Sequence, residues 1–150
     1  MNKAEIKNRL IEECRHKLLE TITNLEIVMA DAQQQANDYG QPKDRYDSFR
    51  AQLMRRRDMM AQQMSKEMQE LKVLGQIDLK KEYAAVGFGA IVLTNDQNYF
   101  ISIGQGKIEL DGETFYTISP MVPMSQAMTG RKKGESFNFR EKKIEIRDVY

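Results

Sequence analysis

Cysteine and histidine are nearly absent from this chain of 150 residues, and each scarcity excludes a class of site. Cys14 is the only cysteine, so no intramolecular disulfide can form and nothing indicates an oxidising compartment. His16 is the only histidine, which excludes a histidine-rich metal site. Because Cys14 and His16 are two positions apart on a predicted helix, they lie on different faces and make a poor catalytic pair. We expect Cys14 in an apolar seam and His16 on an exposed helix surface.

An excess of charge of one sign is also missing. The formal net charge is +1, and basic and acidic residues nearly balance within each half of the chain. Bulk attraction to nucleic acid is therefore not expected, and any electrostatic recognition must come from local patches.

Long apolar runs are absent as well. The first residues, Met1–Lys7, lack the apolar core of a signal peptide. No window approaches the roughly 20 apolar residues that cross a bilayer. The sequence therefore predicts a soluble, cytoplasmic protein.

The character of the chain changes near residue 80. A glycine-poor stretch with helical periodicity precedes that point, and short β-type runs separated by glycines follow it. A chain of this length forms one domain or two small ones. We expect two in an α+β protein: an antiparallel α-helical coiled-coil hairpin over residues 1–79 and a compact β-sheet domain over residues 80–150.

The helical half carries a heptad repeat of apolar residues, which is typical of the a/d seam of a left-handed coiled coil. Gly40 and Pro42 end the first helix, and so short a connection makes the two helices antiparallel neighbours. The seam positions of the first helix are Leu18, Ile22, Leu25, Met29, Ala32, Ala36 and Tyr39.

A second apolar stripe follows the break and includes several flexible methionines. Such side chains fill irregular gaps in a seam, and the alternative is a partner-binding surface. The stripe comprises Tyr46, Phe49, Leu53, Met60, Met64, Leu71 and Leu74, with Met59 and Met68 beside it.

Six β-type runs and one short helix fill the second half. Asp111-Gly112 is a strong tight-hairpin signal between two of the runs. Together they predict a compact antiparallel sheet with one short helix. The expected strands are 86–94, 99–103, 107–110, 113–118, 135–139 and 142–146, and the expected helix is 125–129.

The order of these signals resembles that of a known family. Residues Ser119–Glu135 hold a Ser-Pro, a small-residue helix and the ending Gly-Arg-Lys-Lys-Gly-Glu. This segment resembles the C-terminal signature of the GreA/GreB transcript-cleavage factors, which regulate transcription elongation. Val86–Ala90 looks like the opening strand of that family's C-terminal domain, and the predicted hairpin fits its coiled coil.

The resemblance implies a C-terminal domain with the fold of FK506-binding proteins (FKBP-like). That domain would dock on bacterial RNA polymerase, and the coiled coil would run down the secondary channel toward the active site. Contact with nascent RNA or with DNA in the polymerase complex follows from that placement. The polymerase-binding residues it implies are Ser119, Pro120, Gly130, Arg131, Lys132, Lys133 and Gly134.

At the hairpin tip the family carries two acidic residues that help hold the polymerase's second Mg²⁺. Carboxylates suit this ion, and a second metal stabilises the attacking and leaving oxygens. Aligned on Gly40, the sequence has Gln41 at the first acidic position and Asp44 at the second. Aligned instead on Tyr46, it has Pro42 at the second, so neither alignment restores the pair. The resemblance thus favours docking over stimulated cleavage, with no cofactor beyond Mg²⁺ shared with the polymerase.

Two groups of charged residues remain open to alternative interpretations. Asp38, Asp44 and Asp47 near the tip are either metal ligands or caps that accept backbone N–H bonds at a helix end. Arg55, Arg56 and Arg57 either contact RNA phosphates or channel walls, or cover the seam with their stems. At least one of these three arginines must face the seam or its edge.

The first functional hypothesis is a polymerase-binding elongation regulator that is not itself an enzyme. A second is a prolyl isomerase or chaperone-like module, suggested by the implied FKBP-like fold. That activity needs an aromatic-lined apolar pocket, whereas tryptophan is absent and core packing uses most other aromatic residues. A third is a scaffold that dimerises through the helices.

Overall fold

The computed structural model describes residues 2–40 and 48–150, which form two compact units. Residues up to Arg15 and Val73–Tyr150 make up one unit, called the β unit here, and His16–Lys72 make up the hairpin unit. Two long helices, α1 (Lys3–Tyr39) and α2 (Ser48–Leu74), contribute to both units. Over the described residues, no helix combines the length and apolar character needed to cross a membrane.

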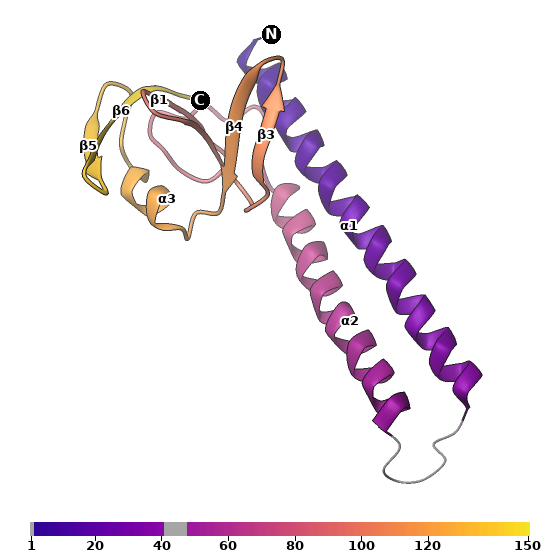
Figure 1. Cartoon of the computed structure of the whole chain (residues 1–150). Helices are drawn as coiled ribbons and strands as arrows, with labels where there is room; N and C mark the ends of the chain where they lie inside the picture. Colours follow the sequence, from indigo (N-terminus) through magenta and orange to yellow (C-terminus); the bar gives the residue numbers. More distant parts are fainter. Residues whose placement is uncertain (1, 41–47) are drawn as a thin grey trace. The chain divides into compact units, whose positions relative to one another are not determined.

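Within the hairpin unit, α1 and α2 lie side by side and run antiparallel (Figure 1). The Tyr39 and Phe49 rings pack with centroids 4.9 Å apart. Farther along both helices, Arg57 Nη1 donates to Gln33 Oε1 at 2.7 Å. Because the earlier residue of α1 meets the later residue of α2, these contacts confirm the expected antiparallel pairing.

Burial along the helices confirms most of the predicted seam. Alanines let two helix backbones approach closely, and both seam alanines are fully covered. The buried seam positions are Leu18, Ile22, Ala32, Ala36 and Leu53, together with Leu74 near the end of α2.

Two methionines of the second stripe depart from the expectation. Met59 and Met68 are 69% and 54% exposed, so they do not fill the seam. Met60 and Met64 lie four positions apart on one face of the helix, and both are half-buried. Only part of the methionine cluster therefore packs between the helices.

The β unit contains one six-stranded sheet with the order β3-β4-β2-β1-β6-β5 (Figure 1). The strands are β1 (Ile91–Thr94), β2 (Asn98–Ile101), β3 (Gly106–Leu110), β4 (Glu113–Ile118), β5 (Ser136–Phe139) and β6 (Lys142–Val149). A short helix, α3 (Pro123–Met128), precedes β5. The predicted α+β architecture, a helical hairpin followed by a sheet domain with one short helix, is confirmed.

Two details of the prediction were wrong. The sheet is mixed rather than wholly antiparallel, because β4 lies between β3 and β2 and runs parallel to β2. The strand expected over 86–94 begins only at Ile91, since Gly89 has φ +88° and interrupts the extended backbone. Val86 instead bonds to the segment after α3, as described below.

Two-residue turns close the β3–β4 and β5–β6 hairpins of the sheet. Asp111 and Gly112 have φ values of 48° and 84°, and Arg140 and Glu141 have 49° and 67°. Positive φ at both central positions is the signature of the type I′ turn, whose twist matches that of the flanking strands. These turns fix the register of β3 with β4 and of β5 with β6.

The core of the β unit follows from alternation along the strands. In β6, Ile144, Ile146 and Val149 are buried, while Glu145 and Arg147 between them are exposed. These side chains pack in one cluster with Val92 and Ile101 of the central strands and Met128 of α3. Burial of Met128 fixes α3 on one face of the sheet. The positions of the residues just before and just after α3 depend on that placement.

Candidate docking segment

Residues 119–134, called the docking segment here, are held by hydrogen bonds at their start. Ser119 Oγ accepts from the Met121 backbone N–H at 3.1 Å. The Ser119 carbonyl accepts from Ser125 Oγ at 2.7 Å, and Ser125 is fully buried. Pro120 and Pro123 restrict φ on either side of Met121. The loop before α3 therefore has a fixed course.

That fixed loop presents one large apolar side chain to solvent. Met121 is 76% exposed, the highest value among the exposed large apolar residues of the described chain. A flexible, polarisable side chain of this kind is typical of protein-binding surfaces. Sequence reasoning missed Met121 as a site residue, although its place between Pro120 and Pro123 was a usable signal.

The segment is tied to the sheet where it leaves α3. Gly130 has φ +84°, and its N–H donates to the Val86 carbonyl at 2.9 Å. The Val86 N–H in turn donates to the Arg131 carbonyl at 2.8 Å. Gly134, with φ +90°, donates to the Ile146 carbonyl at 2.8 Å. Both glycines thus occupy backbone conformations that a side chain would strain.

Of the three basic residues in the segment, Arg131 is already engaged. Its Nε donates to the Ala127 carbonyl at 2.8 Å, and its guanidinium lies 4.9 Å from the centroid of the Phe137 ring. Lys132 is exposed and has no carboxylate within 4 Å among the described residues. Lys133 approaches Asp148 at 3.9 Å. Lys132 and Lys133 are therefore the cations that the segment offers to a partner.

The arginine run on α2 separates into one engaged and two exposed side chains. Arg57 bridges to Gln33 of α1 and also pairs with Asp58 at 2.9 Å. Arg55 and Arg56 are exposed. The prediction that one arginine of the run faces the edge of the seam is confirmed. Their contact with RNA or with channel walls stays a prediction.

Of the three acidic tip candidates, only Asp38 lies within the described residues. Its Oδ1 accepts from Gln34 Nε2 at 2.8 Å, one turn earlier on α1. Asp44 and Asp47 lie outside the described residues. Across 2–40 and 48–150, no group of three or more histidine, cysteine, aspartate or glutamate residues could hold a metal ion.

Sequence reasoning also missed Lys7, which is buried in the β unit. A signal was present, because Lys7 shares the helical face of Leu10, Ile11 and Cys14, all of them buried. A lysine on an apolar stripe is unusual, since lysine is almost never fully buried unless it is paired.

Comparisons with known proteins gave structural matches only. No family model and no curated protein matches the chain. Among solved structures, one described as the transcription factor Gfh1 has a TM-score of 0.35 and 13% identity, covering 91% of this chain and 92% of its own. Gfh1 of Thermus thermophilus, a GreA factor homolog, has a TM-score of 0.34 and 13% identity over 91% of this chain and 94% of its own. Gfh1 of Thermus aquaticus has a TM-score of 0.33 and 14% identity, with 90% and 92% covered.

Proposed function

We propose that this chain binds bacterial RNA polymerase and regulates transcription elongation in the manner of the GreA/GreB factors. The observation that carries it is the docking segment, whose sequence resembles the GreA/GreB signature. Its backbone is fixed at both ends, while Met121, Lys132 and Lys133 extend into solvent.

A fixed backbone with exposed side chains is the physical requirement for a docking surface. Such a surface loses little conformational entropy when a partner binds, so more of the contact energy appears as affinity. An exposed methionine supplies apolar contact area, and two lysines supply attraction to an acidic partner surface. In this proposal the polymerase surface contacted by the segment is acidic around an apolar pocket.

The hairpin unit supplies the second element of the proposal. Each helix contributes about 24 residues to that unit, which corresponds to roughly 36 Å at 1.5 Å per residue. A pair of helices packed through Ala32 and Ala36 is thin, because small side chains let the backbones approach. In this proposal the pair enters the secondary channel, and Arg55 and Arg56 contact RNA phosphate or the channel wall.

The proposed effect is occupancy of the channel rather than delivery of a complete metal-binding pair. Neither alignment of the tip sequence restores the family's acidic pair, and the Asp38 carboxylate accepts a bond from Gln34. A factor of this kind would compete with cleavage factors for the same channel. It would act on the polymerase without being an enzyme itself.

Aromatic burial gives no support to the isomerase alternative. Phe100 and Phe115 are among the largest fully buried side chains of the structure. Tyr99 and Phe137 belong to the core cluster under α3. Side chains used in this way do not line an open pocket for a proline peptide.

The direct test is retention of purified core polymerase by the immobilised chain at low salt, followed by RNA length analysis on stalled complexes. We expect retention, with no RNA shortening by the chain alone and reduced shortening when a cleavage factor competes. Absence of retention at low salt would end the proposal.

Matched variants locate the docking surface. Lys132→Glu and Met121→Asp should weaken retention at least tenfold, whereas Lys143→Glu on the exposed face of β6 should not. All three side chains are exposed, so folding is expected to survive each change. If Lys132→Glu and Met121→Asp bind like the parent chain, the docking segment is not the contact surface.

A further inference from the structure

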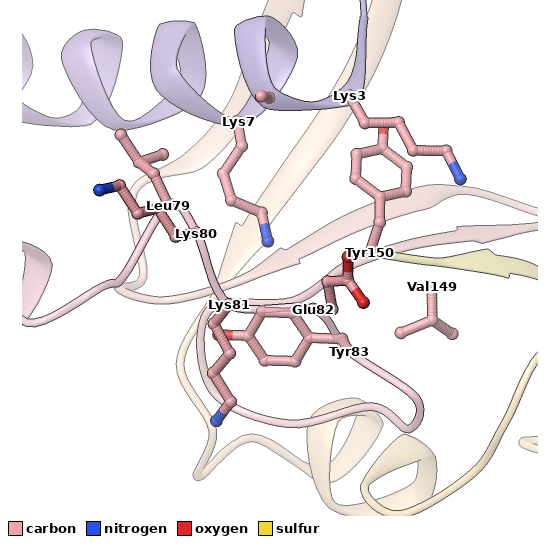
Figure 2. Close-up of a pocket in the computed structure, with 10 residues that line it drawn as sticks. Lys3, Lys7, Leu79, Lys80, Lys81, Glu82, Tyr83, Val149 and Tyr150 are labelled. Carbon is pink, nitrogen blue, oxygen red and sulfur yellow. The ribbon is translucent and has the colours of Figure 1, made fainter.

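A pocket of about 440 Å³ lies within the β unit, and none of the residues that line it belongs to the docking segment (Figure 2). The first turns of α1, the segment 79–83 and the C-terminal residues of the chain line it. Its charged lining residues are Lys3, Lys7, Lys80, Lys81 and one carboxylate, Glu82. Tyr83 and Tyr150 supply its aromatic walls.

Lys7 is the central cation of this pocket. Its side chain is only 3% exposed, and Figure 2 shows it extending from α1 into the pocket, toward Tyr83. Lys7 Nζ lies 4.4 Å from the centroid of the Tyr83 ring. Among the described residues no carboxylate lies within 4 Å of that nitrogen, although Lys3 pairs with Asp148 at 2.9 Å. Lys7 therefore carries a buried charge without a counter-ion.

A second unpaired lysine increases the positive potential at the same place. Lys81 Nζ lies 4.9 Å from the centroid of the same Tyr83 ring. Two ammonium groups thus share one aromatic partner, and the described residues place no carboxylate within 4 Å of Lys81 either. Lys80 also lines the pocket, and Figure 2 shows its ammonium group directed away from Lys7. An anion bound near these cations would offset their mutual repulsion.

The protonation of Lys7 reflects this surplus of charge. Burial, and then the charge of Lys81, lowers the pKa of Lys7 to about 8. A bound anion would act in the opposite direction, because an opposite charge within a few ångströms favours the protonated form. Burial, and then the charge of Asp78, raises the pKa of Tyr83. Burial, and then the charge of Asp148, raises the pKa of Tyr150 to about 12. Neither tyrosine therefore titrates near pH 8.

The walls of the pocket are fixed by the fold. Tyr83 Oη donates to the Phe88 carbonyl at 2.7 Å, and a Cβ at Gly89 would collide with that hydroxyl. The Asp78 side chain accepts from the Lys80 backbone N–H at 2.9 Å, and its carbonyl accepts from the Lys81 N–H at 3.2 Å. A small turn thus sets the positions of Lys80 and Lys81 before any ligand arrives.

We propose that this pocket binds an oligophosphate group, with Lys7 as its buried contact and Lys80 and Lys81 at its mouth. Lysine binds phosphate as a point charge with three donors, and several lysines around one cavity suit a ligand with several negative charges. The volume lies in the range of small-ligand sites and exceeds the needs of a single phosphate. The same chemistry occurs in free oligophosphate and in a nucleoside triphosphate, which the experiment must separate.

The test is calorimetric titration of the full chain at pH 8 and low salt, with inorganic tripolyphosphate in one arm and a nucleoside triphosphate in the other. We expect one ligand per chain. Tighter binding of the nucleotide would show that its base or sugar is also recognised, and equal binding would assign the site to the phosphates alone. Since the polymerase is absent from the assay, its result is independent of the proposed function.

Matched variants identify the contact. Lys7→Met removes the buried charge while keeping an unbranched side chain one atom shorter, and Lys143→Met removes an exposed lysine of β6. We expect Lys7→Met to weaken binding at least tenfold and Lys143→Met to leave it unchanged. Lys81→Met should weaken binding by a smaller factor, and it serves as a second probe of the same pocket.

Proton uptake provides a readout that a general structural effect would not reproduce. Near pH 8 about half of Lys7 is neutral, so a bound anion should draw up to half a proton per ligand onto the chain. The groups that face Lys7 are Lys3, Lys80, Lys81, Glu82, Tyr83 and Tyr150. Titrations in buffers of different ionisation enthalpy should show uptake that is absent in Lys7→Met. No binding in either arm, binding unchanged by Lys7→Met, or equal loss in Lys143→Met would each overturn the proposal.

Discussion

Replacing Lys7 by methionine should stabilise the unliganded protein, because the buried ammonium opposes folding. The shift of its pKa from 10.5 to about 8 corresponds to about 3 kcal/mol of unfavourable interaction with the charged form. Loss of the contact with the Tyr83 ring offsets about 1 kcal/mol of that gain. The net expectation at pH 7 is a stabilisation of about 2 kcal/mol.

The pH dependence of this difference follows from proton binding in the folded and unfolded chains. Below pH 8 both states hold the Lys7 proton, so the full penalty is present. Between about pH 8 and 10.5 the unfolded chain binds more protons than the folded one, so the free energy of unfolding rises with pH. The advantage of Lys7→Met should therefore be largest at pH 7 and shrink steadily through that interval.

Thermal and denaturant unfolding followed by circular dichroism provide the assay. For a chain of this size about 1 kcal/mol corresponds to roughly 2–4 °C in Tm, so we expect a rise of about 4–8 °C at pH 7. Lys143→Met is the control and should change Tm by less than 2 °C at every pH. A Lys7→Met protein less stable than the parent at pH 7, or a difference that does not vary from pH 7 to 10, would refute the reasoning.

Three further changes test other contacts of the β unit. Gly89→Ala should lower stability by about 2 kcal/mol, since φ is +88° and the new Cβ would displace the Tyr83 hydroxyl; an unchanged Tm would contradict this. Arg131→Lys should cost about 1 kcal/mol in denaturant unfolding, because lysine cannot both bond the backbone and stack on Phe137 as arginine does. Burial alone would raise the pKa of Asp148, but hydrogen bonds and nearby lysine charges together lower it below 3.8. The parent chain should therefore lose stability relative to Asp148→Asn as pH falls through that lowered value, and parallel acid-unfolding curves would oppose this assignment.

The parts of the fold that the sequence predicted are those determined by neighbouring residues. Asp111-Gly112 predicted a hairpin, and both residues adopt the positive φ that the turn requires. Alternation predicted most strands to within a few residues, and the heptad predicted which face of α1 is buried. Each of these signals acts over one turn of helix or one reversal of the chain, so the sequence displays it directly.

The details that could not be predicted depend on contacts between distant segments. Local patterns show that β2, β3 and β4 exist, but they do not show that β4 lies between the other two and runs parallel to β2. The same limit applies to Val86, whose β-type sequence is satisfied by bonds to Gly130 and Arg131 rather than by a strand. In both cases the backbone partners are brought together only by packing of the whole unit.

The environment of Lys7 depends both on the local sequence pattern and on a contact with a distant segment. Its position on the apolar stripe of α1 is visible in the sequence, and it indicates a charge at a place where burial is expected. The partner that tolerates this charge, the Tyr83 ring, lies more than seventy residues away along the chain. Because an aromatic ring compensates a buried ammonium less well than a carboxylate does, its presence in place of an acid leaves positive charge for a ligand to neutralise. The same residue should therefore weaken the empty protein and strengthen the occupied one, so Lys7→Met should lose the stabilisation by oligophosphate that the parent chain shows.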